Sequence, residues 1–388
     1  MNACAKDPYE EYIKFFKEVY DTMQENYYQP VSPEAYDRFI EKFRTKIYAQ
    51  LKGEKKTDDY VRWRSASYLI KDLKTSEDIF SEFYPPQPAQ EYKQQALAVR
   101  INLGIQGELA QEGFYVKNVE PHSDAYEKGL RIHDIILFID GKDIKGLSQQ
   151  KIEELLNPVA ESQVKFKYLC HGDQLEKEMS VTSKEYFQQT VFMVPVPAEG
   201  VYCLEVRHFN KKTSEELLRY LQYFKQEPFK GLILDLRGNP GGPPLAAREI
   251  SSFFLKGGDQ FAYFQRKEEK KSWLDVPTIP EKFQYEGPLV ILVDQKSGSA
   301  SELFAGILQR RNRAVLMGTN SAGQVMLKSM YNLEDGSMVL LVTARGHHPD
   351  GAAFSFQGLT PDRYVGAQEN DNILKYATNY LLFKDKLN

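Results

Sequence analysis

Two nearly continuous apolar runs, Gly231–Leu236 and Leu289–Val293, constrain the fold of this 388-residue chain more than any other feature. Strands of this kind are buried on both faces, as in a parallel sheet that is covered by helices. Each run leads through a glycine- or serine-rich turn into a stretch with helical periodicity, Leu245–Phe254 and Glu302–Gln309 respectively. The alternation begins near residue 200, where a further helix, Thr213–Phe224, carries a capping-box pattern. We therefore expect an α/β core with a mainly parallel sheet.

The N-terminal part of the chain has a different pattern. Residues 8–52 show apolar side chains at helical spacing in two stretches, and the second stretch begins with Ser32 as an N-cap followed by Pro33. Residues 53–94 are charged and then rich in proline, which predicts a linker. We expect a first region over residues 1–94, made of helices and this linker.

A third pattern occupies residues 95–184. Short alternating runs predict strands at Phe114–Val119, Ile135–Ile139 and Val164–Tyr168, and Ser148–Leu156 has helical spacing. This arrangement predicts a small, mostly antiparallel β-module. The core is then expected to span residues 185–388.

Composition excludes several classes of partner. Lys and Arg number 50 and Asp and Glu number 54, so the net charge of −4 gives no electrostatic footprint for nucleic acid. The chain has three cysteines without a CxxC pair, and six histidines without HExxH spacing. We expect no disulfide framework, no metal and no cofactor.

Cys4 raises the question of location. The order Met1-Asn2-Ala3-Cys4 resembles the end of a trimmed bacterial lipoprotein signal. An acylated Cys4 would tether the protein to a membrane of the bacterial cell envelope, on the periplasmic side. The alternative is an ordinary exposed thiol.

Two turns carry residues suited to catalysis. Asp235–Gly242 follows one buried strand, and its successive N–H groups suit an oxyanion. Lys296–Glu302 follows the other strand and places Ser299 at a helix N-terminus. Because both turns follow the carboxyl ends of parallel strands, we expect them to meet. The structural alternatives are a turn braced by an Asp–Arg pair and a plain helix cap.

These segments together resemble one family. GLILDLRGNPGG (residues 231–242) resembles the core signature of the tail-specific, or C-terminal processing, serine peptidases. GSASELFAGIL (298–308) is similar to the nucleophile loop of that family, and GAAFSFQGLTPD (351–362) to a late segment. The β-module resembles a PDZ domain, with Leu103-Gly104-Ile105 at its peptide-carboxylate loop.

The resemblance implies a ClpP/crotonase-like peptidase core with an N-terminal helical region and an inserted PDZ module. Ser299 corresponds to the nucleophile, and the N–H groups of Ala300 and of Gly241 or Gly242 to the oxyanion hole. The implied activity is endopeptidase or carboxyl-terminal processing chemistry through an acyl-enzyme. The implied partners are polypeptide substrates, whose C-termini the PDZ module binds at Leu103, Gly104 and Ile105.

The general base departs from the family pattern. The expected lysine position holds Gln324, and the expected glutamine position holds Lys328. A glutamine amide does not titrate, so Gln324 cannot accept the proton of the serine. On a straight strand Lys328 would lie about 13 Å beyond Gln324. Lys296 is expected to point outward, and His208 is a further candidate.

Two other functions remain open. A catalytically inactive relative would act as a peptide- or protein-binding scaffold, and a crotonase-like acyl-transfer enzyme would use the same glycine turn. We also consider a homodimer formed through the aromatic faces of the N-terminal helices.

Overall fold

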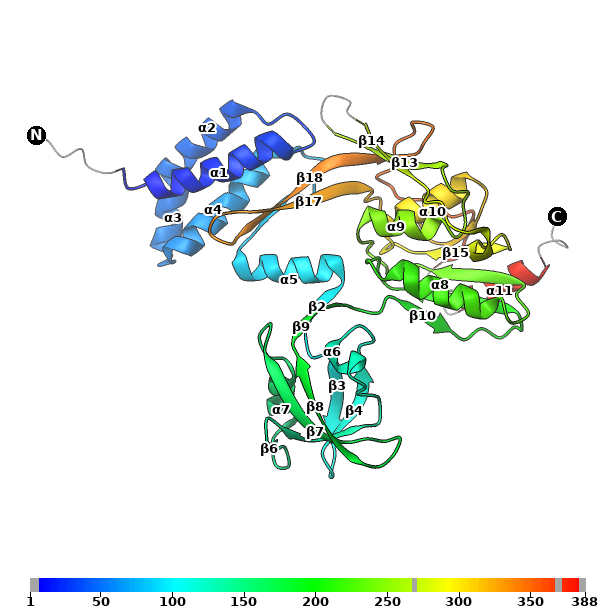
Figure 1. The fold of residues 1–388 in the computed structure, drawn as a ribbon. Coiled ribbons are helices and arrows are strands. Elements are labelled where there is room, and N and C mark those ends of the chain that lie inside the picture. Colours follow the sequence, from blue (N-terminus) through cyan, green and yellow to red (C-terminus); the bar gives the residue numbers. More distant parts are fainter. Residues whose placement is uncertain (1–6, 267–270, 367–371, 384–388) are drawn as a thin grey trace, which may run out of the picture.

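The computed structural model describes residues 7–266, 271–366 and 372–383 (Figure 1). A helical region, a small β-module and a larger α/β core succeed one another along the chain. Cys4 lies outside the described residues. Among the helices described, none is long and apolar enough to cross a bilayer.

The N-terminal region is more helical than its sequence suggests. Its helices are α1 (Glu10–Asn26), α2 (Pro33–Lys42), a π-helical turn (Phe43–Ile47), α3 (Tyr48–Gly53) and α4 (Asp58–Leu73). Ser32 caps α2 as expected, since its side chain accepts a hydrogen bond from the N–H of Ala35 at 3.1 Å.

The structure corrects the expectation of a linker over residues 53–94. This stretch contains α4, the short strand β1 (Glu82–Tyr84) and most of α5 (Pro86–Leu97). The charged residues of α4 mask an apolar face, on which Val61 and Leu69 are fully buried. Pro86 occupies the first turn of α5, where the missing N–H costs no helical hydrogen bond.

The aromatic faces of the N-terminal helices are also not available for a dimer. Phe16, Phe39 and Phe43 are at most 1% exposed and pack within the same chain. Their cluster includes Val339 and Leu341 of a core strand, so this region is fixed to the core.

The β-module is an antiparallel sheet in the order β3-β4-β5-β7-β8, with β6 beside β5. Its strands are β3 (Ile105–Leu109), β4 (Phe114–Val119), β5 (Ile135–Ile139), β6 (Lys142–Asp143), β7 (Gln163–Leu169) and β8 (Glu176–Thr182). The helices are α6 (Asp124–Glu127) and α7 (Gln149–Leu156). A two-stranded ribbon, β2 (Val99–Asn102) with β9 (Lys184–Phe187), connects the module to the rest of the chain.

The core contains the expected sheet, ordered β10-β11-β12-β15-β16-β19, in which every pair except β10–β11 is parallel. Its strands are β10 (Val191–Val194), β11 (Val201–Val206), β12 (Gly231–Asp235), β15 (Leu289–Val293), β16 (Val315–Gly318) and β19 (Arg363–Tyr364). Helices α8 (Thr213–Phe224), α9 (Pro244–Ser251) and α10 (Ala300–Arg310) share one buried cluster with the sheet. Helix α11 (Ile373–Phe383) shares another. Leu232 and Leu234 belong to the first cluster and Ile233 to the second, which explains the continuous apolar strand.

A second sheet joins the core to the N-terminal region. It has the order β1-β18-β13-β14, with β17 also paired to β18. The bounds are β13 (Gln260–Gln265), β14 (Lys271–Asp275), β17 (Met326–Asn332) and β18 (Met338–His347). β1 pairs antiparallel with β18, and the N–H of Tyr28 donates to the carbonyl of Val342 at 3.0 Å. The long β17–β18 hairpin therefore passes beneath the N-terminal helices (Figure 1).

Candidate active site

The two catalytic turns meet, as the sequence predicts. β12 and β15 are neighbours, and the turns that follow them are joined by hydrogen bonds. The N–H of Gly238 donates to Asp294 Oδ1 at 2.9 Å, and the N–H of Gly298 donates to the carbonyl of Asn239 at 3.0 Å. Ser301 Oγ donates to the same carbonyl at 3.0 Å. These bonds fix the glycine turn against the serine turn.

Gly241 lies directly beside the serine. Its φ is +106°, and a Cβ at this position would lie 2.8 Å from both Ser299 Cβ and Ala300 N. Only glycine allows this approach. The N–H of Gly241 already donates to Asn239 Oδ1 at 2.9 Å. By contrast, the N–H groups of Gly242 and Ala300 have no hydrogen-bond acceptor among the described residues.

Ser299 has an unusual backbone for a residue with a side chain. Its φ is +53° and its ψ is −113°, immediately before the first residue of α10. Strain of this kind persists only where the surrounding structure enforces it, and it is concentrated at functional sites. The N–H of Ser299 donates to Glu302 Oε2 at 2.9 Å, which holds the turn.

Glu302 organises the site, and our sequence analysis gave it no role. Its side chain is 1% exposed and accepts four hydrogen bonds. Besides that of Ser299, the donors are Ser321 Oγ at 2.6 Å and the N–H groups of Gly323 at 2.6 Å and Gln324 at 2.7 Å. The S-x-x-E spacing predicts the first bond. The other three come from a loop about 20 residues later and left no local signal.

A cavity of about 490 Å³ opens beside Ser299. Helix α5, the two turns and strand β17 all contribute to its wall. Ser299, Gln324, Lys328, His208 and Gly242 line it together. One cavity therefore adjoins the predicted nucleophile, the two positions whose residue types are exchanged relative to the family pattern, and the candidate histidine.

The chain between Gln324 and Lys328 is not the straight strand on which the expected separation of about 13 Å depends. The N–H of Met326 donates to the carbonyl of Gln324 at 2.7 Å, which closes a tight turn before β17 begins. The pairing of β17 with β18 then shifts register between Leu327 and Lys328. Lys328 consequently faces the same cavity as Gln324.

The environment of Lys328 disfavours its charged form. Burial lowers its pKa, an effect that Glu82 partly opposes. Its Nζ lies 5.1 Å from the ring centre of Phe80, and it forms no ion pair with a carboxylate among the described residues. Loss of hydration without a paired charge favours the unprotonated form.

The other two candidates differ from Lys328. His208 Nε2 lies 3.1 Å from the carbonyl of Gln95 and 3.2 Å from that of Ala96, which places the ring proton on Nε2. Burial lowers the pKa of His208, and its Nδ1 is buried without a hydrogen-bond partner in the described part of the chain. Lys296 is exposed, as expected.

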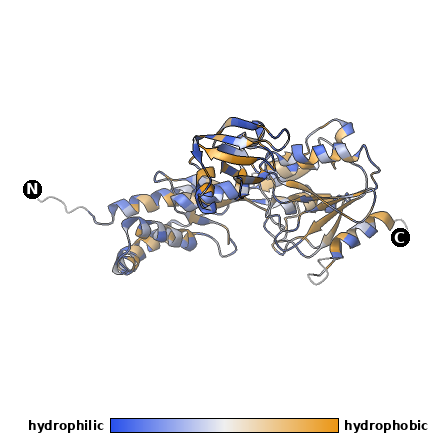
Figure 2. Cartoon of the chain, turned by 90° about the horizontal axis from the view of Figure 1, so that it is seen from below, coloured by the Kyte–Doolittle hydropathy of each residue, from blue (hydrophilic) through white to orange (hydrophobic). Residues whose placement is uncertain are grey.

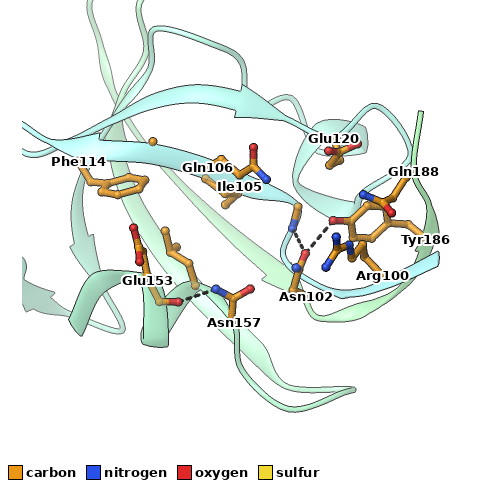
Figure 3. Close-up of a pocket in the computed structure, with 13 residues that line it drawn as sticks. Arg100, Asn102, Ile105, Gln106, Phe114, Glu120, Glu153, Asn157, Tyr186 and Gln188 are labelled. Atoms are coloured by element: carbon orange, nitrogen blue, oxygen red, sulfur yellow. Dashed lines mark hydrogen bonds between the residues drawn. The ribbon is translucent and has the colours of Figure 1, made fainter. Parts of the chain in front are cut away.

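The peptide-carboxylate loop lies at a second pocket of about 430 Å³, between β3 and α7 (Figure 3). Gly104 and Ile105 line this pocket, whereas Leu103 is fully buried behind it. Gly104 has a φ of +73°, and its N–H donates to Asn102 Oδ1 at 2.7 Å.

Known families match both parts of this arrangement. Residues 201–365 match the model of peptidase family S41, and residues 90–169 match the PDZ domain model. Over its α/β core the chain is therefore similar to peptidase family S41. The first match covers both catalytic turns, and the second covers the strands that form the groove.

Curated relatives carry corresponding names. A carboxyl-terminal-processing protease from Synechocystis sp. is 29% identical over 251 residues, which are 63% of this chain and 57% of that protein. The carboxy-terminal processing protease CtpA of Bacillus subtilis is 24% identical over 328 residues, which are 81% of this chain and 67% of that protein. The chain thus spans about three fifths of the length of these S41 relatives.

Solved structures share the fold. The photosystem II D1 C-terminal processing protease has a TM-score of 0.52 at 20% identity, over 94% of this chain and 96% of that one. The tricorn protease has a TM-score of 0.54 at 16% identity, over 96% of this chain and 37% of that one. These likenesses confirm the expected fold class, an α/β core with a PDZ module.

Proposed function

We propose that this protein is a serine endopeptidase that processes polypeptides near their carboxyl termini. The observation that carries the proposal is the convergence of the two turns on Ser299, beside a cavity that is also lined by a half-buried lysine with a lowered pKa. The names of the curated relatives support the same activity.

In the proposed reaction Ser299 Oγ attacks the carbonyl carbon of the scissile peptide bond, and the neutral amine of Lys328 accepts the hydroxyl proton. The N–H groups of Gly242 and Ala300 hold the oxyanion, because these two amides are unoccupied and the amide of Gly241 is not. Protonated Lys328 then donates to the leaving amine as the C–N bond breaks. A water molecule, deprotonated by Lys328, hydrolyses the acyl-enzyme and releases Ser299.

Gln324 has a supporting role in this proposal. Its Oε1 lies 3.7 Å from the position that a Cβ on Gly298 would occupy, so the amide adjoins the serine turn. An amide there can orient the Ser299 hydroxyl or the substrate by hydrogen bonding, without exchanging a proton.

The test uses a fluorophosphonate probe and an unfolded protein substrate. Wild-type protein is expected to react with the probe at Ser299 and to cleave the substrate, and Ser299→Ala is expected to do neither. Ser272→Ala, at an exposed position on β14, is the control. Unchanged cleavage by Ser299→Ala would refute the assignment.

The scaffold alternative rests on Gln324, and one variant separates it from the peptidase. If the wild type is inactive because the base is missing, Gln324→Lys should create cleavage. If Lys328 is the base, Gln324→Lys should instead lower the rate, because a second cation would disfavour protonation of Lys328.

We further propose a location at the bacterial cell envelope, with an acyl chain on Cys4 as a membrane tether. The support is the position of Cys4 directly after Ala3 in the sequence. Metabolic labelling with a palmitate analogue should mark the wild type and leave Cys4→Ser unmarked. Equal labelling of both proteins would exclude the tether.

A further inference from the structure

The open edge of the PDZ sheet has a limited length. β3 is the outermost strand, and its register with β4 identifies which peptide groups face away from the sheet. Gly107 is opposite Val116, whose N–H donates to Asp134 and whose carbonyl accepts from His133, both on the β5 side. Both peptide groups of Gly107 therefore point to the open edge.

The same reasoning applies to Ile105. The carbonyl of Gly104 accepts a hydrogen bond from the N–H of Glu120 on the β4 side, at 2.9 Å. Because successive carbonyls of a strand point in opposite directions, the peptide groups of Ile105 face outward. An added peptide strand would pair with this edge.

Gln149 occupies the far end of the edge. Its Nε2 donates to the carbonyl of Gly107 at 3.0 Å, and its Oε1 accepts from the N–H of Leu109 at 2.8 Å. Nε2 also donates to Glu153 Oε1 at 2.6 Å, which holds the side chain in place. Gln149 is the first residue of α7, and Ser148 caps this helix. The helix therefore fixes the backbone of the residue that occupies this end of the edge.

The near end is adapted to a carboxylate. Asn102 Oδ1 accepts from the N–H of Gly104 and, at 2.8 Å, from the hydroxyl of Tyr186 on the ribbon (Figure 3). An amide oxygen thus lies between two donors that also suit a carboxylate oxygen. Arg100 and Glu120 line the same end, and their charges offset each other. The attraction for a carboxylate must therefore come from the N–H of Gly104 and the hydroxyl of Tyr186.

Part of the pocket wall is apolar. Phe114 and Leu156 line it together with Ile105, and Phe114 marks the end away from Arg100 in Figure 3. Between the two occupied ends, the free groups on the edge are the N–H and carbonyl of Ile105 and the N–H of Gly107. These groups suffice for the terminal residue and the third residue from the end of an antiparallel tail.

We propose that Gln149 restricts the PDZ groove to the last three residues of a polypeptide that ends in an apolar residue with a free carboxylate. This inference deepens the proposed function, since it names the feature of the substrate that the module recognises. Residues upstream of the third position leave the sheet edge at Gln149, and their sequence does not affect binding.

The test measures peptide binding by fluorescence anisotropy on the full chain with Ser299→Ala, which prevents turnover. The ligands are a labelled tetrapeptide and octapeptide that share the ending Ala-Ala-Val, and the octapeptide amide. We expect the two acids to bind within twofold of each other and the amide at least tenfold more weakly. In Gln149→Ala the octapeptide should bind about threefold to tenfold more tightly than the tetrapeptide, because two edge groups become free.

Two further variants keep the test decisive. Gln150→Ala is the matched control, because this neighbour is exposed and should retain equal affinity for both lengths. Gln149→Glu removes the donor to Gly107 and retains the acceptor for Leu109, so a smaller preference for length is expected. The proposal fails if the wild-type groove prefers the octapeptide more than threefold, if Gln149→Ala shows no length preference, or if amidation has no effect. Probe labelling and cleavage by the chain with an intact Ser299 test the peptidase activity separately.

Discussion

The two candidate catalytic turns and the PDZ groove both hold backbone N–H groups with amide or carboxylate side chains, but these side chains differ in burial. At the turns, Asn239 is 0% and Glu302 is 1% exposed, and each fixes several backbone groups. At the groove, the half-buried side chains of Asn102 and Gln149 bind the edge groups themselves. The comparison indicates that buried side chains hold the frame of the turns and leave the N–H groups of Gly242 and Ala300 without an acceptor among the described residues, whereas side chains that a ligand meets at the surface bind the groove edge.

The largest effect should come from the one group at the turns that must change its charge. Lys328→Met keeps an apolar side chain of similar length and removes the base, so we expect kcat to fall about 10²- to 10⁴-fold. Single-turnover cleavage measures this loss, and Lys296→Met is the exposed control. A decrease of less than tenfold would mean that a group other than Lys328 accepts the proton of Ser299.

The same residue predicts a pH dependence. Because the pKa of Lys328 is lowered in the folded chain, wild-type activity should rise with pH through that lowered pKa and level off before the ordinary value for lysine. Between the two pKa values the unfolded chain binds more protons, so the free energy of unfolding should also rise with pH. Denaturation of Lys328→Met should lack this rise. The interpretation is wrong if both proteins show the same slope.

The next largest effect tests the hydrogen bonds by which Glu302 holds the serine turn and the loop at residues 321–324. Glu302→Ala leaves four donors without an acceptor, and we expect the free energy of unfolding to fall by about 3–5 kcal/mol, with loss of probe labelling at Ser299. Urea denaturation measures the change, and the exposed Glu281→Ala should stay within about 0.5 kcal/mol of the wild type. If Glu302→Ala is as stable as the wild type and Ser299 still reacts with the probe, the proposed difference between the turns and the groove is wrong.

A substitution in the groove should impair the PDZ module and leave the two turns unchanged. Gly104→Ala places a Cβ 2.3 Å from Ser123 Cβ at a positive φ, so we expect a loss of about 1–2 kcal/mol that is confined to the module. Peptide binding should disappear while probe labelling at Ser299 stays normal. Equal loss of labelling would show that the two sites depend on each other.

The smallest effect concerns the contact between the regions. His122 Nε2 lies 3.0 Å from Glu216 Oε1, and Glu216 also accepts bonds from Thr190 and Val191. His122→Ala removes one of several bonds, so about 1 kcal/mol is expected. Limited proteolysis at the β2–β9 ribbon should become faster, and His171→Ala on the exposed surface should not change it. An unchanged cleavage rate would exclude this contact as a constraint on the module.

The sequence predicts features that are encoded locally. The turns around Gly241 and Ser299, the strands of the module and the cap at Ser32 each have their signal within a few residues. Fold class follows from the alternation of strands and helices, and comparison with known proteins confirms it. The roles of Ser299, Gln324 and Lys328 stay predictions.

Features that depend on distant residues were missed. Glu216 was expected to form a capping box with Thr213, but α8 lacks this cap, and Glu216 instead binds residues 190–191 and His122. Glu302 likewise binds the loop at residues 321–324. A carboxylate that pairs across the fold has no periodicity that sequence reasoning can detect, since its partners are set by tertiary packing.

The pairing of β1 with β18 has a consequence for synthesis. Phe80 and Glu82 lie near the amine of Lys328, yet β1, which begins at Glu82, can pair only after residues 338–347 have left the ribosome. Some 250 residues separate the two partners, and contacts of such long range form late in folding. The amine therefore gains its apolar surroundings only when the chain is nearly complete, so a nascent or truncated copy would lack the environment that lowers the pKa of the proposed base.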